Sequence, residues 1–388
     1  MKFFHLSDLH IGKQLKGYSL KGSQEAIFRQ VIAYTAAEQP DAVLICGDIY
    51  DKSVPSAEAF TAFDRFLTEL SESSERTEIL VISGNHDSAE RLSYASSFLR
   101  RHRIHIGALP PQSEKEKLLK VTLEDKWGPV HFYLFPFIRP GYVRHLFEEG
   151  EVTDYDSAFR AVLSREKIQA EERNVILAHQ FFVSGGSRPE TCDSETALYT
   201  AGGLDKIDAS ALEAFDYAAL GHLHGPQKAG EERFRYCGSP GKYSVSEEHH
   251  KKSVTVVTMG EKGMPLTIET LPLTMEPEVR RLRGTLEEVK ALAVSFREDF
   301  VSITLTDEQE VFDFREQLEE LYDRILEIRM DNERTRRKLT EEVGELEIPD
   351  PVTSFASFFE VIRRCPLTKE QEQVMREIVA EAEEDERR

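Results

Sequence analysis

The stretch FFHLSDLHIG, residues 3–12, joins a short apolar run to two ionisable side chains, Asp8 and His10, that lie two positions apart. Four later stretches repeat this arrangement of an apolar run followed by a turn of polar or ionisable residues: LICGDIYD at 44–51, VISGNHD at 81–87, ILAHQ at 176–180 and ALGHLH at 219–224. Five of the 12 histidines of the chain fall in these turns. Such a concentration indicates that the five turns belong to one functional site.

Short apolar runs recur up to about residue 275, and each has the length of a buried strand. The clearest are 3–6, 42–46, 79–82, 131–135, 175–178 and 217–220. Helical patterns often follow them, and alternating strands and helices predict a layered α/β core. Because ligands bind at the open ends of strands in such sheets, we expect the five polar turns to meet at one edge.

Two stretches, 56–70 and 90–101, carry apolar side chains at helical spacing. We interpret both as amphipathic helices that pack on the central sheets. A contact between two copies of the chain is the alternative interpretation.

The chain divides into three parts in this interpretation. Residues 1–275 form the main domain, and TLPLTMEPE at 270–278 has two prolines and no helical period, which places a boundary near residue 276. Residues 276–333 then predict a small unit with strands at 279–283, 300–306 and 325–330, and with helices from 285 and around 312–321. Residues 334–388 contain a charged connector at 334–347 and two helices, at 353–365 and 368–386.

The two C-terminal helices carry two further signals. Thr368 and Gln371 match a capping box at the start of the second helix. The first helix has too many apolar residues for a segment so remote from the main core, namely Phe355, Phe358, Phe359, Val361 and Ile362. These residues indicate a docking surface for a partner, with a contact inside the chain as the alternative.

Seven side chains of the polar turns offer carboxylate, amide or imidazole donors, a set that suits Mn²⁺, Fe²⁺ or Zn²⁺: Asp8, His10, Asp48, Asn85, His179, His222 and His224. In D-x-H and H-x-H the two-residue period sends both side chains to one side of an extended segment. Seven donors exceed what one catalytic ion uses. If Asp48 bridges, two ions roughly 3.5 to 4 Å apart receive four contacts each, as in a two-metal hydrolase. Any one of these histidines alone would more simply be a hydrogen-bonded structural residue.

The ordered set D-x-H, G-D-x-x-D, G-N-H-D, a lone histidine and G-H-x-H resembles the calcineurin-type metallophosphoesterase superfamily. Within it, HLSDLHIG, GDIYD, SGNHD, ALGHLH and RYCGSPGKYS are similar to a branch of bacterial DNA-repair nucleases. The resemblance implies an αββα sandwich followed by a small α+β capping domain and a C-terminal helical segment. It also implies that Asp8, His10, Asp48 and His224 hold one Mn²⁺ and that Asp48, Asn85, His179 and His222 hold the other.

The same resemblance assigns the chemistry. His86 would be the catalytic histidine that contacts the scissile phosphate or protonates the leaving oxygen, with Asp51, or alternatively Asp87, orienting it. The implied activity is two-metal hydrolysis of phosphodiesters, as a double-strand exonuclease and a single-strand or hairpin endonuclease in double-strand-break repair and recombination. Two alternatives stay open: a small-molecule phosphodiesterase or phosphatase with the same site, and a non-catalytic scaffold.

Three partners follow from the resemblance or from the basic residues. The C-terminal helices would bind a coiled-coil ATPase of the SMC type, and ATP hydrolysis is assigned to it because the chain has no G-x-x-x-x-G-K-[ST]. A second copy of the chain would pack on helices of the core. For DNA, the loop after His10 offers Lys13, Lys16 and Lys21, and Arg100, Arg101 and Arg103 form a second cluster, although solvated lysines are the simpler interpretation.

Composition limits these expectations only loosely. The 388 residues include 49 Lys and Arg against 70 Asp and Glu, and the net charge of −21 argues against non-specific attraction to nucleic acid without excluding a DNA substrate. No apolar run approaches the ~18 residues of a membrane span. Four scattered cysteines without a C-x-x-C pair favour reduced thiols. We therefore expect a soluble, cytoplasmic protein.

Overall fold

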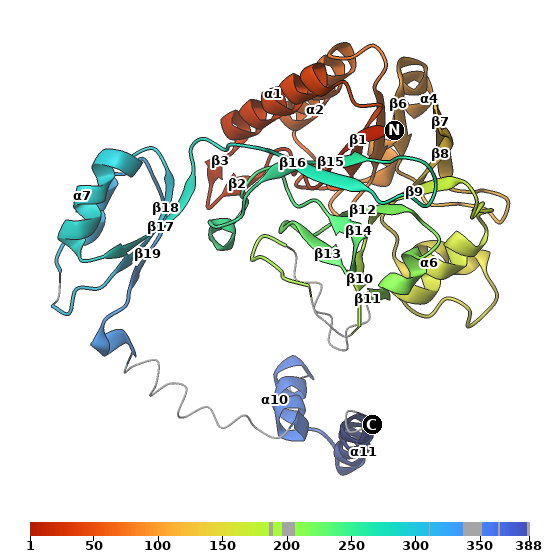
Figure 1. Ribbon diagram of the computed structural model, residues 1–388. Helices are drawn as coiled ribbons and strands as arrows, with labels where there is room; N and C mark the ends of the chain where they lie inside the picture. The colour runs from red at the N-terminus through yellow and green to blue at the C-terminus, as the bar shows by residue number, and fades with distance from the viewer. Residues whose placement is uncertain (186–188, 196–205, 310, 337–350, 364, 386–388) are drawn as a thin grey trace. The chain divides into compact units, whose positions relative to one another are not determined.

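The computed structural model describes residues 1–185, 189–195, 206–309, 311–336, 351–363 and 365–385 (Figure 1). It contains two compact units, which are described separately. The first comprises Met1–Thr304 and Asp313–Ile328, and the second comprises Leu305–Phe312 and Arg329–Arg388.

Two six-stranded sheets form the centre of the first unit. One has the order β16-β15-β1-β4-β5-β6, with β1 (Lys2–Leu6), β4 (Ala42–Cys46), β5 (Glu78–Ile82), β6 (Ile104–Gly107), β15 (Ser253–Thr258) and β16 (Thr267–Pro272). The other has the order β13-β14-β12-β9-β8-β7, with β7 (Leu119–Asp125), β8 (Gly128–Phe135), β9 (Arg173–His179), β12 (Tyr217–Gly221), β13 (Gln227–Ala229) and β14 (Glu231–Tyr236). All six strands that the sequence predicts are present.

Four strands of each sheet run parallel, and antiparallel pairing extends one edge of the first sheet and both edges of the second. In the first sheet β1, β4, β5 and β6 are parallel, and β15 and β16 add an antiparallel hairpin. In the second sheet β8, β9, β12 and β14 are parallel, with β7 and β13 antiparallel at the two edges. Parallel strands bring their carboxyl ends to one edge of each sheet, which is where the polar turns lie.

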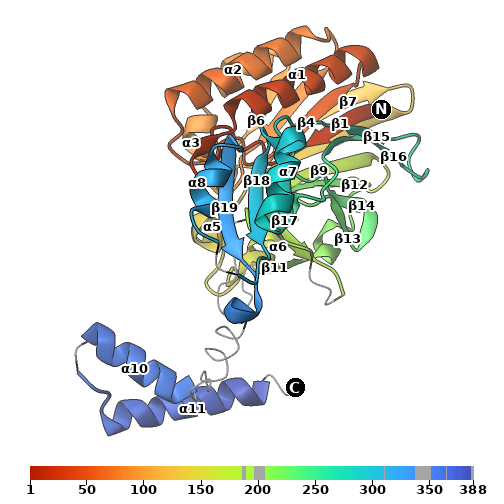
Figure 2. The ribbon, with the colours of Figure 1, turned by 90° about the vertical axis from the view of Figure 1, so that its left-hand side faces the viewer.

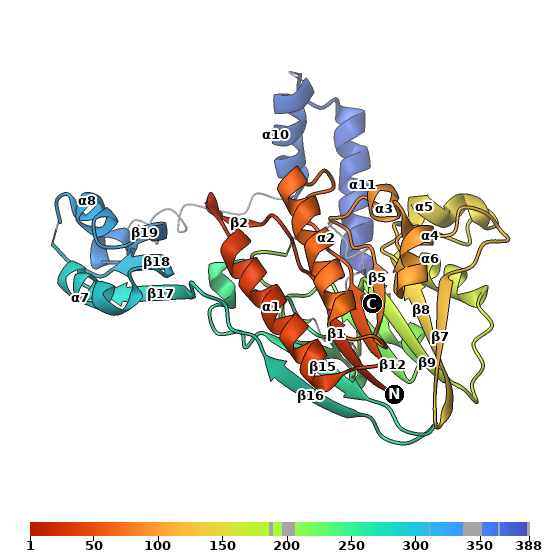
Figure 3. The ribbon, with the colours of Figure 1, turned by 90° about the horizontal axis from the view of Figure 1, so that it is seen from above.

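Strand alternation divides the buried side chains into three layers. Phe3, Leu44 and Cys46 from the first sheet meet Phe132 and Leu177 from the second in a core between the sheets. The opposite face of the first sheet packs on α1 (Lys21–Glu38) and α2 (Ala57–Glu72), which lie side by side in Figure 3. The opposite face of the second sheet packs on α6 (Tyr155–Ser164) and the 3₁₀ turn Ala209–Leu212. This αββα order confirms the predicted layered fold.

The predicted helix at 56–70 is α2, which Ser56 caps by accepting a hydrogen bond from the Ala59 backbone nitrogen at 3.2 Å. Phe63, Phe66 and Leu70 are buried beneath it, so the packing interpretation is correct for this helix.

The single helix expected at 90–101 is wrong. The chain forms three short turns there: α3 (Ala89–Leu92), α4 (Ser96–Leu99) and the 3₁₀ turn η1 (Arg100–His102). Ala95 adopts a left-handed conformation with φ of 59° and interrupts the helix, which helical spacing of apolar residues cannot reveal. Leu92 is buried, whereas Tyr94 and Phe98 are 83% and 61% exposed, so packing on the sheet does not account for this stretch.

The remaining elements of the first unit are short. They are β2 (Gln14–Leu15) and β3 (Tyr18–Ser19), β10 (Phe181–Val183) and β11 (Lys206–Asp208), α5 (Pro140–Val143), and the 3₁₀ turns Arg144–Leu146 and Val245–Glu247. The hairpin of β2 and β3 immediately follows the Asp8–His10 turn.

A three-stranded sheet of β17 (Val279–Gly284), β18 (Phe300–Leu305) and β19 (Arg324–Met330) has α7 (Leu286–Phe296) and α8 (Phe314–Glu319) on one face (Figure 3). Strands and helices thus lie where the sequence predicts them, and a capping box at Thr285 and Glu288 starts α7. The domain boundaries at 275 and 333 stay predictions.

The second unit contains α10 (Pro351–Arg363) and α11 (Lys369–Asp385), which lie against each other in Figure 2. The predicted capping box is present, because Gln371 and Thr368 exchange hydrogen bonds of 3.0 and 3.3 Å.

The apolar residues of α10 differ in exposure. Phe358 is 62% exposed. Phe355 and Phe359 are half-buried with ring centroids 6.2 Å apart. The side chains of Val361 and Ile362, and most of the connector at 334–347, lie outside the described residues. No helix of the described residues is long and apolar enough to cross a membrane.

Candidate metal centre

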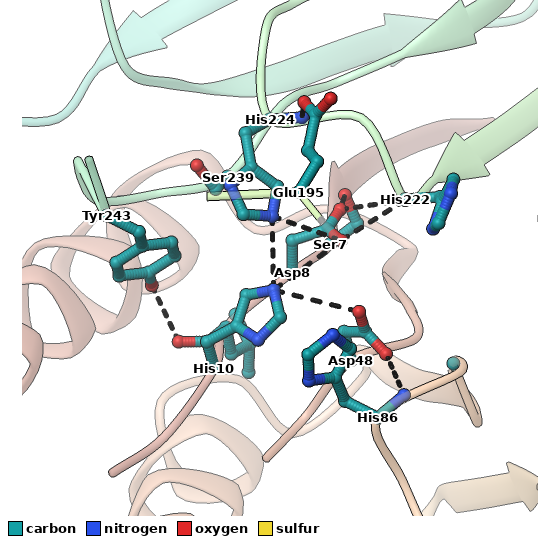
Figure 4. A network of polar contacts seen from close by, with 12 residues as sticks. Ser7, Asp8, His10, Asp48, His86, Glu195, His222, His224, Ser239 and Tyr243 are labelled. Carbon is teal, nitrogen blue, oxygen red and sulfur yellow. Dashed lines mark hydrogen bonds and ion pairs between the residues drawn. The ribbon is translucent and has the colours of Figure 1, made fainter. Parts of the chain in front are cut away.

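Strand ends from both sheets bring the seven predicted donors together. Asp8 follows β1, Asp48 follows β4 and Asn85 follows β5, while His179 ends β9 and His222 follows β12. Figure 4 shows the side chains of Asp8, His10, Asp48 and His224 converging on one point. A hydrogen bond of 2.7 Å between His179 Nδ1 and the Cys46 carbonyl oxygen joins the two sheets directly beneath this point.

The backbone is strained where these donors leave the strands. Four of them have positive φ angles without being glycine: Asp8 (54°), His10 (44°), Asp48 (50°) and His222 (98°). Such conformations persist only where the surroundings impose them, and they cluster at functional sites. All four belong to the predicted donor set.

Four donors surround the first part of the site. The Asp8 Oδ1 atom lies 4.0 Å from His10 Nε2 and 3.9 Å from His224 Nε2, and the two imidazole Nε2 atoms face each other at 3.1 Å. Asp48 Oδ2 lies 3.7 Å from His10 Nε2. Donor atoms bonded to one first-row cation at ~2.0 to 2.2 Å lie roughly 3 Å apart when adjacent and about 4 Å apart when opposite, so these separations fit a shared ion.

Four donors surround the second part of the site in the same way. Asp48 Oδ2 lies 3.3 Å from His179 Nε2. Asn85 Oδ1 lies 3.1 Å from His179 Nε2 and 3.0 Å from His222 Nδ1. Asp48 is therefore shared between the two groups, as the bridging interpretation requires.

The burial of the site favours a bound cation. Burial lowers the pKa of His222 to about 3 and that of His10 well below its usual value, so both rings are neutral and can donate lone pairs. His10 Nδ1 is buried without a hydrogen-bond partner among the described residues. Two carboxylates and four imidazoles packed this closely form an oxygen and nitrogen donor set suited to a divalent first-row ion.

The charge of His179 also favours a bound cation at these donors. Burial alone would lower the pKa of His179, but the Asp48 carboxylate outweighs burial and raises this pKa to about 9. In the absence of an ion, the proton on His179 is thus the positive charge that stabilises buried Asp48. Cation binding at these donors releases such protons.

His86 has a main-chain partner that the sequence did not predict. Its Nδ1 lies 2.8 Å from the backbone carbonyl oxygen of Asp51, while the Asp51 carboxylate pairs with Lys13 Nζ at 2.8 Å. The carboxylate does remain in the same cluster, because Asp51, His10 and His86 each offer an atom within 4.8 Å of the others.

Asp87, the alternative orienting residue for His86, has backbone groups as its hydrogen-bond partners. Its carboxylate accepts backbone N–H bonds from Gly84, Ile49 and Tyr50 at 2.9 to 3.1 Å. Asp87 therefore ties the loops after β4 and β5 to each other.

The basic residues fall into distinct environments. Lys13 is 17% exposed and reaches the site through Asp51, whereas Lys16 is exposed and Lys21 lies 3.9 Å from Glu58. Arg103 donates to the carbonyl oxygens of Ser71 and Ser74, so its guanidinium stabilises the fold rather than facing solvent. Arg100 and Arg101 are exposed.

Several polar residues that support the site were missed from the sequence. Gln24 donates to the Leu9 and His10 carbonyl oxygens, and the Tyr243 hydroxyl donates to Leu9 as well. A second group surrounds His224: Ser194, Glu195, Ser239, Glu247 and Lys252. None belongs to a metal-binding pattern, and the only sequence signal was the RYCGSPGKYS similarity near some of them.

Gly84 makes the close approach of Asp48 feasible, and Gly84→Ala tests this. A Cβ atom at residue 84 would lie 2.2 Å from Asp48 Oδ1 and 2.3 Å from its backbone nitrogen, so Asp48 must shift. We expect divalent-cation affinity to fall by roughly 10- to 100-fold, the range for changes that displace a metal ligand through its support. Isothermal titration with Mn²⁺ measures this.

Gly141→Ala is the matched control, since a Cβ atom there meets nothing within 4 Å. Unchanged affinity in Gly84→Ala would show that Asp48 is not a ligand or that the loop relaxes freely.

Comparisons with known proteins agree with this geometry. A family model described as calcineurin-like phosphoesterase matches residues 1–226, and one described as type 5 capsule protein repressor C-terminal domain matches residues 277–362. The chain is 29% identical over 330 residues to the D subunit of the nuclease SbcCD from Staphylococcus epidermidis, covering 84% of each chain. It is 28% identical over 383 residues to the protein of the same name from Staphylococcus saprophyticus, covering 98% of each.

Among solved structures, a dimetal phosphatase from Danio rerio aligns with 71% of this chain and 99% of its own at 13% identity and a TM-score of 0.40. The two staphylococcal relatives confirm the similarity of the chain to the D subunit of SbcCD nucleases.

Proposed function

Because the chain belongs to the calcineurin-like phosphoesterase family, we propose that it hydrolyses DNA phosphodiesters as the nuclease subunit of a repair complex. The observation that carries phosphoester hydrolysis is the convergence of seven donors from five strand ends beside His86. The similarity to SbcD nucleases over 98% of the chain supports DNA, rather than a small ester, as the substrate. The activities in this proposal are those of a double-strand exonuclease and a single-strand or hairpin endonuclease, acting in double-strand-break repair and recombination.

In this proposal Asp8, His10, Asp48 and His224 hold one divalent cation, and Asp48, Asn85, His179 and His222 hold the other. Mn²⁺ is the native ion, although Fe²⁺ and Zn²⁺ suit the same donors. When bound, the cations supply charge that stabilises the developing negative charge on the phosphate oxygens.

His86 contacts the scissile phosphate or gives a proton to the leaving group. Its Nδ1–H donates to the Asp51 carbonyl oxygen, which fixes the ring and its tautomer. Nε2 is then the nitrogen that contacts the scissile phosphate or gives a proton to the departing oxygen. Asp51 contributes through its backbone and, through its carboxylate, holds Lys13 beside the site.

Lys13 is the DNA contact that the geometry supports best among the three lysines, because it lies next to His86 and the donor cluster through Asp51. Lys16 and Lys21 extend the same loop and contact phosphates farther along the backbone. These contacts are independent of base sequence.

The proposed ATP-hydrolysing partner is a coiled-coil ATPase of the SbcC type, related to SMC proteins. Its binding surface on this chain comprises α10 and α11, where Phe358 is an exposed apolar anchor. The complex works in the cytoplasm, at the nucleoid.

A second copy of the chain is the other proposed partner. A groove of about 940 Å³ lies between α2 and the turns of residues 89–103, and the exposed Tyr94 and Phe98 rings line it. We expect the wild-type chain to have the mass of a dimer in light scattering coupled to gel filtration, and the double variant Tyr94→Ser, Phe98→Ser to have that of a monomer. Trp127→Ser removes an exposed aromatic ring elsewhere and is the control. A monomeric wild-type chain would contradict this proposal.

The nuclease proposal is tested by incubating the purified chain with end-labelled linear duplex and hairpin DNA, with Mn²⁺ or EDTA, beside bis-p-nitrophenyl phosphate. We expect Mn²⁺-dependent DNA cleavage that EDTA abolishes. Hydrolysis of the small ester alone, even after the ATPase partner is added, would favour a small-molecule phosphodiesterase or phosphatase. Loss of all hydrolysis in protein that binds metal would favour a non-catalytic scaffold.

A further inference from the structure

We propose that Glu247 is a positioning residue for His224, acting through the Ser194 hydroxyl to fix which imidazole nitrogen faces the metal centre. This inference rests on the proposed metal-dependent function. It concerns residues outside the seven donors and the catalytic histidine.

Glu247 and Lys252 form an ion pair within the protein interior. Their side chains are 0% and 2% exposed, and Lys252 Nζ lies 2.5 Å from Glu247 Oε2. The same ammonium donates to Ser239 Oγ at 2.8 Å and to the His224 carbonyl oxygen at 3.0 Å. A buried charge pair is retained where it is fully hydrogen-bonded, and every donor of this ammonium has an acceptor.

The positions of the hydrogen atoms follow from this pairing. Ser194 Oγ lies 2.5 Å from Glu247 Oε1 and 2.8 Å from His224 Nδ1, and Glu247 Oε1 lies 3.5 Å from the same nitrogen, so the hydroxyl is the closer of two links between the carboxylate and the ring. An ionised carboxylate beside an ammonium can only accept, so the single Ser194 hydroxyl hydrogen is donated to Glu247. Ser194 Oγ must then accept from His224, which places the imidazole proton on Nδ1.

The consequence is a lone pair on His224 Nε2, the nitrogen that faces Asp8 Oδ1 at 3.9 Å and His10 Nε2 at 3.1 Å. The backbone of His224 is held as well, since its nitrogen donates to Glu195 Oε1 at 2.7 Å (Figure 4). Partners of this kind orient a metal-binding imidazole and raise its basicity.

The two halves of the metal centre differ in this respect. His179 Nδ1 has the backbone carbonyl oxygen of Cys46 as its partner, which no side-chain substitution removes. His224 depends on two side chains contributed by distant segments, Ser194 and Glu247. Loss of the Ser194 hydroxyl should therefore weaken the ion on the His224 side and leave the other ion in place.

The arrangement also gives a physical role to the stretch RYCGSPGKYS, residues 235–244, whose residues the chemistry does not use. Ser239 Oγ lies 3.3 Å from Glu247 Oε2, and the Tyr243 backbone nitrogen donates to Glu247 Oε1 at 3.1 Å. This stretch thus holds the carboxylate that directs His224.

The test uses the full chain and Mn²⁺ as the probe. Ser194→Ala is expected to weaken one of two Mn²⁺ sites by roughly 10- to 100-fold, measured by titration calorimetry and by the electron paramagnetic resonance signal of free Mn²⁺. Ser194→Thr keeps the hydroxyl and should restore the affinity. Ser246→Ala removes a hydroxyl of the 3₁₀ turn Val245–Glu247 that contacts Asp193 and Ser244, and it is the matched control. Melting temperatures in EDTA should be alike in all four proteins.

A second readout needs no metal. Long-range proton–nitrogen correlation spectra of ¹⁵N-histidine protein in EDTA should show His224 protonated at Nδ1, and Ser194→Ala should shift this ring toward the Nε2–H tautomer. Glu247→Gln should do the same, because its amide can donate to Ser194 and reverse the hydrogen-bond direction.

The inference is overturned if Ser194→Ala binds both Mn²⁺ ions with wild-type affinity. It is also overturned if His224 of the wild-type chain is the Nε2–H tautomer. Either result leaves the proposed function standing. Equal weakening of both sites would also overturn it. A wild-type chain that binds no divalent cation would instead overturn the metal centre, and the inference with it.

Discussion

His86→Ala is expected to lower the rate of DNA cleavage by roughly 10²- to 10⁴-fold while both divalent cations remain bound. The range is that of a lost proton-transfer group, because the side chain lies beside the donors without belonging to either group of four. Its ring centroid is 4.9 Å from that of His10, and the His86 backbone nitrogen donates to Asp48 Oδ1 at 2.8 Å. The substitution keeps this backbone bond, so the site should keep its shape.

The measurement pairs single-turnover cleavage of end-labelled DNA with the Mn²⁺ content after equilibrium dialysis. His249→Ala serves as the control, because the His249 side chain is 89% exposed and does not belong to the buried donor set. If His86→Ala loses Mn²⁺ as strongly as it loses activity, His86 is a ligand and the proton-transfer role is wrong.

Asp48→Asn is expected to lose both cations and, with them, all measurable cleavage. Asp48 Oδ2 is the atom shared by the two groups, at 3.7 Å from His10 Nε2 and 3.3 Å from His179 Nε2. His179 and its neighbours hold the pKa of Asp48 well below its usual value even though burial alone would raise it, so the side chain is ionised. Removing this charge leaves each cation with fewer anionic donors in a buried site, where unbalanced charge is costly.

Asparagine keeps an oxygen that can accept the His86 backbone hydrogen, so folding should be retained and metal loss can be attributed to the charge. Metal content by inductively coupled plasma mass spectrometry after dialysis is the readout, with Asp48→Ala as the larger deletion. Retention of one Mn²⁺ per chain would mean that Asp48 serves one ion only and does not bridge.

The strands and the donor set were predictable because both depend on local pattern. Short apolar runs have few alternatives to buried strands, and parallel strands necessarily bring their carboxyl ends to one edge. Asp8, Asp48 and His222 could therefore be grouped from sequence alone. The residues that orient them could not, since Ser194 and Glu247 are 30 and 23 positions from His224 and match no metal-binding spacing.

One local prediction, the helix at 90–101, was wrong, and one on His86 stays a prediction. The spacing of apolar residues at 90–101 predicted a helix, but Ala95 adopts a left-handed conformation that interrupts it, and the spacing carries no information about backbone angles. Asp51 was expected to orient His86 through its carboxylate. The structure gives His86 the Asp51 carbonyl oxygen as a hydrogen-bond partner and pairs the Asp51 carboxylate with Lys13. Residue identity does not reveal such a division between main chain and side chain.

By itself, the sequence determined the layered α/β fold, the seven donors and the position of His86 among them, because strand length, turn composition and donor chemistry are properties of short segments. Only the tertiary structure decided how far apart these donors lie, that the Asp51 carbonyl oxygen contacts His86, and how Glu247 reaches His224. Those properties depend on distances of a few ångströms between segments far apart in the chain. Such distances are set by the packing of the two sheets against each other and by the strained turns that leave them.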